Sequence, residues 1–129
     1  PGGAYGFRVT DPESGRGVAY LPDNELAAVE GVCGGRRALL EAIAGAELLV
    51  HDATYLPAEL PARRGWGHSS YAEAVRLCAD AGVPRPLLSH HDPDRDVAAL
   101  DAVAHVAATV GRAHGVDVAL AREGVLVVV

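Results

Sequence analysis

Hydrophobic residues follow two different periods along the chain, one typical of strands and the other of helices. Short runs rich in β-favouring residues, each bounded by turn formers, lie at 5–10, 18–21, 47–51, 86–89, 117–120 and 125–129. Apolar residues recur every three or four positions over 36–45, 70–81 and 96–114. The middle helix has the strongest start signal, because Ser70 and Glu73 form a capping box in which each side chain binds a free backbone N–H. Strands and helices are therefore expected to alternate.

Both ends of the chain are predicted to form hairpins. Residues 11–17, which are rich in turn formers, join the first two strands, and Glu123-Gly124 joins the last two. Strands that alternate with helices between two hairpins favour an α/β fold, with a mixed β-sheet and helices packed on one face. The whole chain, residues 1–129, is expected to form a single domain.

The composition is that of a folded, acidic protein. Half of the residues are apolar, 22% are charged and the formal net charge is -6, which excludes a disordered chain or a coiled coil. The excess of acid argues against a general electrostatic grip on nucleic acid or on an anionic membrane. No run approaches the roughly 18 consecutive apolar residues of a membrane span, so we expect no membrane association and a cytoplasmic location. Cys33 and Cys78 match neither a disulfide framework nor a zinc knuckle, and both are predicted to be free thiols.

Polar residues with catalytic potential gather where predicted strands end or helices begin. They are Asp23, His51-Asp52, His68-Ser69-Ser70 and His90-His91-Asp92. Because sites in open α/β sheets form at such strand ends, these side chains are expected to lie near one another. Imidazole and carboxylate groups together suit zinc, manganese or iron, whereas carboxylates alone would suit magnesium or calcium. The residue types therefore favour a transition-metal site.

Each of these residues also has a purely structural interpretation. Asp23 follows a strand and fits a turn or helix-cap position, and Asp52 fits an Asx turn. His51 ends a buried strand, as a hydrogen-bonded core histidine would, and His68 fits a solvated loop. The adjacent pair His90-His91 is the exception, because two histidines after a buried strand offer no packing or turn advantage.

The longest predicted loop spans 55–69, where two prolines and the segment 65–67, Gly-Trp-Gly, interrupt any regular period. Long loops in compact domains are often functional. Trp66 could stack on a base, and Arg63 and Arg64 could clamp a phosphate. An exposed loop anchor without a ligand is the alternative interpretation.

Four segments, taken in order, resemble a known family. They are Leu-Pro-Asp23-Asn-Glu, Leu-Leu-Val-His51-Asp52-Ala-Thr, Gly-Trp-Gly-His68-Ser-Ser and Leu-Leu-Ser-His90-His91-Asp-Pro. At these separations they are similar to the C-terminal half of metallo-β-lactamase-fold hydrolases, in the ribonuclease Z and phosphodiesterase branch. The similarity extends over essentially the whole chain. It implies half of an αββα sandwich, which in its complete form holds two zinc ions, with manganese or iron as alternatives.

The same resemblance implies roles for individual residues. Asp23 would bridge the two metal ions, and His90 would complete the second metal site, with His91 as the fallback ligand. Asp52 and His68 would form the catalytic pair that handles a proton or contacts phosphate beside the metals. Ribonuclease Z usually has Glu at the position of Asp52, so the carboxylate here is one methylene shorter.

The family's first motif, His-x-His-x-Asp-His, supplies most of the metal ligands and does not occur in this chain. The chain also contains no Met, so Pro1 is not a translational start. We therefore expect a segment whose N-terminal half is absent, cleaved or carried on another polypeptide. By itself, such a segment is expected to be inactive.

Two functions follow as hypotheses. The first is a metal-dependent hydrolase module that cleaves a phosphodiester or related ester in a small-molecule or nucleotide-type substrate, with a metal-bound hydroxide as the nucleophile. The second is a non-catalytic half domain that binds a partner chain, or a second copy of itself as a homo-oligomer, through an exposed sheet edge. The apolar strand expected at 125–129 favours such association.

Overall fold

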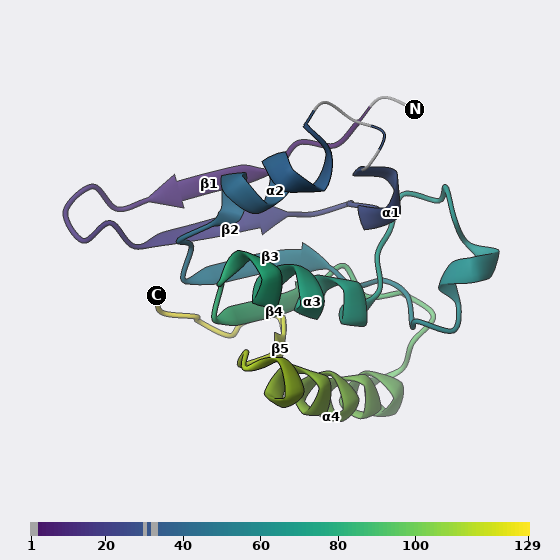
Figure 1. Ribbon diagram of the computed structural model, residues 1–129. Coiled ribbons are helices and arrows are strands. Elements are labelled where there is room, and N and C mark those ends of the chain that lie inside the picture. The colour runs from purple at the N-terminus through teal and green to yellow at the C-terminus, as the bar shows by residue number, and fades with distance from the viewer. Residues whose placement is uncertain (1–2, 30, 32–33) are drawn as a thin grey trace.

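A five-stranded mixed sheet forms the centre of the structure, a computed structural model that describes residues 3–29, 31 and 34–129 (Figure 1). In both spatial and chain order, its strands are β1 (Phe7–Thr10), β2 (Gly17–Leu21), β3 (Leu48–Asp52), β4 (Arg85–Ser89) and β5 (Ala119–Leu120). β1 and β2 are antiparallel, and the later neighbours all pair in parallel. The carboxyl ends of β2, β3 and β4 therefore lie at the same edge of the sheet.

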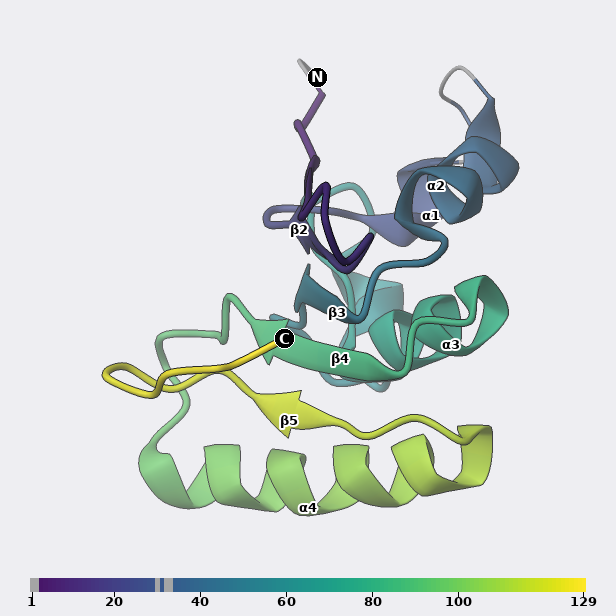
Figure 2. The ribbon, with the colours of Figure 1, turned by 90° about the vertical axis from the view of Figure 1, so that its left-hand side faces the viewer.

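The described helices are α1 (Leu26–Val29), α2 (Gly35–Ile43), α3 (Tyr71–Ala81) and α4 (Val97–His114), with the 3-10 turn η1 (Leu60–Ala62) in the long loop. α1, α2 and α3 lie on one face of the sheet, and α4 runs below the edge that β5 forms (Figure 2). Leu49 of β3 packs into one apolar cluster with Ile43 and Val75, and Leu88 of β4 packs into a second with Ala107 of α4. The predicted α/β class, with a mixed sheet and helices on one face, is confirmed.

Local signals predict most of these elements correctly. The opening hairpin and the three longer helices form within two residues of the expected bounds. The Ser70 hydroxyl accepts a hydrogen bond from the Glu73 N–H at 3.3 Å, and the Glu73 carboxylate accepts one from the Ser70 N–H at 2.9 Å. This capping box begins α3 directly after the long loop. The sequence pattern misses α1, because a single helical turn carries too little periodicity.

The closing hairpin predicted from 117–120 and 125–129 is wrong. β5 pairs with β4 in parallel, and residues 125–129 form no strand. α4 lies along the outer edge of β5, where a returning strand would have to pair (Figure 2). The chain instead crosses to the helix-free side of the sheet, where the Arg85 guanidinium donates a hydrogen bond to the Val128 carbonyl at 2.9 Å.

No helix of the described residues lies over the opposite face of the sheet (Figure 2). β1 and β2 expose apolar side chains there. Strand pairing puts Phe7 opposite Tyr20 and Val9 opposite Val18 on this face, which we call the open face. Phe7, Val9 and Tyr20 are 61%, 72% and 44% exposed. Large apolar side chains are therefore exposed side by side on the open face.

Two remaining expectations concern the cysteines and a membrane span. Cys78 is a buried free thiol, as predicted, and its burial raises the pKa of the thiol to about 12. Cys33 lies outside the described residues. Among the helices that the structure describes, none has the length and apolar character needed to cross a membrane.

Candidate metal centre

Three predicted site residues meet at the edge where the parallel strands end. Asp23 lies two residues beyond β2, Asp52 ends β3 and His90 directly follows β4. The three strands are parallel neighbours in the order β2, β3, β4, so their carboxyl ends lie side by side. The chain order of the motifs thus becomes a spatial row at one sheet edge.

His68 reaches the same edge from the long loop. The loop returns to the sheet through a parallel bridge between Tyr55 and Ser70, in which the Tyr55 N–H donates to the Ser69 carbonyl at 3.1 Å. The Ser69 hydroxyl accepts a hydrogen bond from the Leu26 N–H at 3.0 Å. These contacts fix the backbone on the C-terminal side of His68, so its imidazole is held in place and does not lie free in solvent.

The ligand atoms of Asp23, Asp52, His68 and His90 all lie within 4.8 Å of one another. Asp23 Oδ1 is 3.2 Å from His90 Nε2 and 3.5 Å from His68 Nδ1. His68 Nδ1 is 2.7 Å from Asp52 Oδ2, and the two imidazole rings are stacked with centroids 4.9 Å apart. Carboxylate and imidazole groups from four separate segments therefore converge on one small volume.

Asp52 is the anchor of this group. Its side chain is fully buried, and Oδ1 accepts hydrogen bonds from the Thr54 N–H at 3.0 Å and the Ser69 N–H at 3.2 Å. Oδ2 accepts from the Asn24 N–H at 3.4 Å and from His68 Nδ1 at 2.7 Å. Both carboxylate oxygens are therefore already occupied by donors from the protein. Asp52 is better suited to orient its neighbours than to bind a metal ion directly.

Hydrogen bonds also determine which imidazole nitrogens remain free. His90 Nδ1 lies 3.0 Å from the Thr54 hydroxyl, and His68 Nδ1 lies 2.7 Å from the Asp52 carboxylate. An ionised carboxylate can only accept, so Nδ1 carries the proton in His68 and the lone pair of that ring is on Nε2, the atom that a metal ion or a proton can bind. In His90, Nε2 is the ring nitrogen that lies beside Asp23.

Two residues at this edge have unusual backbone conformations. Asp23 has φ 32° and His90 has φ 56°, which makes them the positive-φ non-glycine residues of the described chain. Positive φ is energetically unfavourable for residues other than glycine, and residues that nevertheless adopt it concentrate at functional sites. The Thr54 hydroxyl, 2.6 Å from the His90 carbonyl oxygen, supports one of these turns.

The types of ligand atom in this cluster suit a divalent transition metal, but Asp23 and His90 are fewer than the ligands such an ion needs. Asp23 and His90 offer a carboxylate oxygen and an imidazole Nε2 that lie 3.2 Å apart, with His68 beside them. Zinc in proteins usually has four ligands. Asp23 and His90 by themselves can therefore supply only part of such a ligand set.

His51 stands apart from this group, although it was a candidate at the same strand end. It is fully buried, and this burial lowers the pKa of its imidazole. The neutral ring donates from Nδ1 to the Asp52 carbonyl at 2.6 Å and accepts on Nε2 from the Asn24 amide at 3.0 Å. His51 is thus the hydrogen-bonded core histidine of the structural interpretation, and through Asn24 it fixes the turn that carries Asp23.

The buried His51 predicts a loss of stability in mild acid. Its pKa lies below the ordinary value of about 6.5 in the folded state, so the unfolded chain binds a proton first as the pH falls. The stabilisation is complete above pH 6.5 and declines below it, by at most about 1.4 kcal/mol per pH unit. The negative charges of Asp52 and Glu73 oppose this shift without reversing it.

Urea unfolding between pH 5 and pH 7.5 measures the effect. His51→Gln should remove part of the pH dependence, whereas His105→Gln, on an exposed position of α4, should leave it as in the wild type. Parallel stability curves for the wild type and His51→Gln would contradict the assignment.

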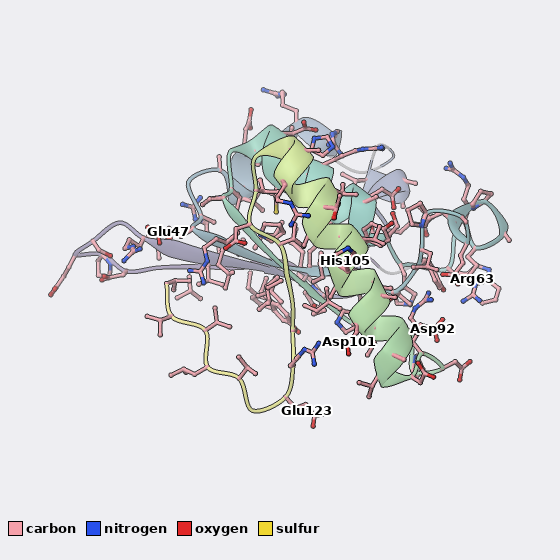
Figure 3. The ribbon with its side chains drawn as sticks, turned by 90° about the horizontal axis from the view of Figure 1, so that it is seen from below. Glu47, Arg63, Asp92, Asp101, His105 and Glu123 are labelled. Carbon is pink, nitrogen blue, oxygen red and sulfur yellow. The ribbon has the colours of Figure 1, made fainter. Side chains whose placement is uncertain are left out.

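The other residues of the late motif lie outside the cluster. His91 Nε2 is buried without a hydrogen-bond partner among the described residues, and burial lowers the pKa of this imidazole. Asp92 accepts from the Asp94 N–H at 3.0 Å and pairs with Arg63 at 3.5 Å. Arg63 and Asp92 lie beside the N-terminal end of α4 (Figure 3). The geometry thus groups His90, and not the fallback His91, with Asp23.

Sequence reasoning names Ser69 among the polar candidates but misses Asn24 and Thr54, which also hold this cluster together. Asn24 and Thr54 each bind Asp52 or His51, and each is adjacent or next but one to a candidate residue. That adjacency is the signal that could have found them. Nothing in their types distinguishes them from ordinary turn or cap residues.

The chain is similar to known proteins in sequence and in fold. Residues 1–91 match the family model of the beta-lactamase superfamily domain. A ribonuclease Z from Brevibacillus brevis is 34% identical over 85 residues, which make up 66% of this chain and 24% of that protein. The chain spans about a quarter of the length of the curated relatives that it matches first.

Two solved structures have the same fold. Human tRNase Z, short form, aligns with 90% of this chain and 34% of its own, at a TM-score of 0.61 and 24% identity. The metallo-beta-lactamase fold protein YhfI from Bacillus subtilis aligns with 94% of this chain and 42% of its own, at a TM-score of 0.64 and 21% identity. Identities at this level show a shared fold and nothing more specific.

Proposed function

Because this chain belongs to the beta-lactamase superfamily domain family and has the metallo-β-lactamase fold, we propose that it carries part of the active site of a metal-dependent hydrolase. The observation that supports this most strongly is the cluster of Asp23, Asp52, His68 and His90, with ligand atoms within 4.8 Å of one another. We infer a phosphodiester or related ester as the substrate, since several relatives are named ribonuclease Z.

Asp23 and His90 are the residues that would hold the metal. Asp23 has two carboxylate oxygens on an exposed side chain and can serve two ions at once, while His90 offers Nε2. A bound zinc, manganese or iron ion would polarise the scissile group and lower the pKa of a water molecule. Further ligands have to come from outside the cluster, because two side chains do not complete a zinc site.

His68 and Asp52 are suited to proton transfer. The His68 Nδ1–H donates to the buried Asp52 carboxylate at 2.7 Å, which leaves Nε2 as the atom that exchanges a proton. The negative charge of Asp52 stabilises the protonated imidazole, and the Thr54 and Ser69 N–H groups keep that carboxylate in place. We assign to His68 the donation of a proton to the leaving oxygen, a role typical of a positioned imidazole.

Hydrolysis of bis(p-nitrophenyl) phosphate tests the function. In the protein that contains this chain, we expect turnover that a chelator abolishes and that added zinc or manganese restores. Turnover that persists after complete removal of metal, confirmed by elemental analysis, would contradict the proposal.

A second proposed function concerns association through the open face. Its alternating apolar residues, among them Phe7, Val9 and Tyr20, form the kind of surface on which a second sheet packs in a two-sheet sandwich. We propose that this face is covered by a second sheet of the same fold, supplied by further chain, a partner chain or another copy.

Light scattering of the chain 1–129 tests this association. The isolated chain should form concentration-dependent oligomers, and Val9→Glu on the open face should reduce them. Val97→Glu is the matched control, because Val97 is 69% exposed against 72% for Val9 but lies on α4. A constant monomer mass, or equal effects of both substitutions, would refute association of copies through the open face.

A further inference from the structure

We propose that Trp66 is a stacking platform that binds a nucleobase of the substrate next to the candidate metal centre. The proposal rests on the proposed function for the bond that is cleaved, but binding of the base can be measured separately. Trp66, an exposed aromatic residue of the long loop, would then act as a positioning residue for a nucleotide.

A cleft connects Trp66 to the candidate centre. It has a volume of about 680 Å³, and Trp66, Asp23 and His68 all line it. Val29 and Ala28 add apolar surface to the same cleft. A substrate group that lies against Trp66 therefore occupies the same cleft as the residues assigned to metal binding and proton transfer.

The segment around Trp66 is held although its side chain is exposed. The Glu25 carboxylate accepts one hydrogen bond from the Gly65 N–H at 2.8 Å and another from the Gly67 N–H at 2.9 Å. Both glycines have positive φ, 82° and 94°, a conformation that residues with a side chain rarely adopt. Two hydrogen bonds to one carboxylate thus fix the backbone on each side of Trp66.

The indole itself has little contact with the protein. Trp66 is 66% exposed, and the Arg63 guanidinium lies 5.8 Å from its ring centroid. Arg63 also lies 4.8 Å from the Tyr55 ring centroid and pairs with Asp92 at 3.5 Å. A large aromatic side chain that is held by its backbone but exposed over most of its surface can contribute to binding far more than it contributes to packing.

The chemistry of the surroundings favours a nucleotide over other aromatic ligands. A planar base can stack on the indole, while the permanently charged guanidinium of Arg63 lies over the same ring and suits a phosphate. The proposed reaction already requires a phosphodiester within reach of Asp23. The combination of an aromatic surface, a cation and a phosphate-cleaving centre matches one nucleotide unit of the substrate.

Fluorescence provides a direct test, because Trp66 is the single tryptophan of the chain. Adenosine 5′-monophosphate, titrated without metal, should quench the emission with saturation. Ribose 5-phosphate, which has the same sugar phosphate without the base, should not. Equal quenching by both ligands, or no quenching by either, would overturn the stacking proposal. This measurement needs no catalysis, so a failure of the proposed hydrolase function would not produce the same result.

Variants at Trp66 lose the fluorophore, so calorimetry measures their binding of adenosine 5′-monophosphate. Trp66→Leu should weaken binding about 10-fold or more, and Trp66→Phe should retain most of it, since a phenyl ring still stacks. Glu25→Ala should also weaken binding, because it releases the backbone on both sides of Trp66. Tyr20→Leu on the open face is the matched control and should change nothing. Unchanged affinity in Trp66→Leu would overturn the proposal.

Discussion

Replacing Asp23 with Asn is expected to reduce kcat/KM for bis(p-nitrophenyl) phosphate by at least about 10³-fold, which corresponds to the several kcal/mol that metal-ion catalysis supplies. The amide removes the negative charge that would bind two ions, while the shape of the side chain stays the same. Asn also tolerates the positive φ of 32° at this position better than most residues do. The backbone should therefore be preserved, and the loss should reflect metal binding.

Elemental analysis and unfolding should accompany the Asp23→Asn assay. We expect the variant to bind less metal than the wild type and to keep the same free energy of unfolding within about 0.5 kcal/mol, as for other exposed substitutions. Asp94→Asn, an exposed aspartate in the loop after β4, is the matched control and should keep full activity. Wild-type turnover in Asp23→Asn would remove the basis of the metal assignment.

Replacing Asp52 with Ala is expected to destabilise the fold by at least about 3 kcal/mol. The substitution leaves the Thr54 and Ser69 N–H groups without their acceptor, and an unpaired buried donor costs about 1–3 kcal/mol. The Asn24 N–H and His68 lose the same carboxylate. The effect should therefore exceed that of a single lost hydrogen bond, because one side chain serves several donors.

Urea denaturation at neutral pH measures this loss of stability. Asp101→Ala provides the control, since Asp101 pairs with Arg122 on the surface and both side chains are 57% exposed. Exposed pairs contribute little, so this variant should lose no more than about 1 kcal/mol. A change below about 1 kcal/mol in Asp52→Ala would mean that water replaces the carboxylate and that Asp52 does not anchor the cluster.

The candidate site was partly predictable because strand ends are predictable. Apolar runs before Asp23, Asp52 and His90 indicate where three strands end, and parallel pairing brings such ends to one edge. The sequence does not reveal that both oxygens of Asp52 are already occupied by protein donors. That depends on Ser69 and Asn24, which approach from segments far away along the chain.

Loop geometry was the least predictable feature. Nothing local indicates that the Glu25 carboxylate reaches across to Gly65 and Gly67, because the contact spans about 40 residues and forms only when the loop returns to the sheet. At residues 125–129, by contrast, the local pattern predicts a strand that does not form. Its pattern suits a strand, but strand formation needs an available edge, and α4 lies along the edge of β5.

Local periodicity and capping by themselves determined where the main helices and inner strands of this protein lie, because a helix start such as Ser70 and its Glu73 partner interact within one turn. Only the tertiary structure decided which polar residues share a site. His51 and Asp52 are neighbours in sequence, yet one imidazole is enclosed in the core while the adjacent carboxylate faces His68. Successive side chains of a strand point to opposite faces, and what each face meets depends on segments that the chain brings back later.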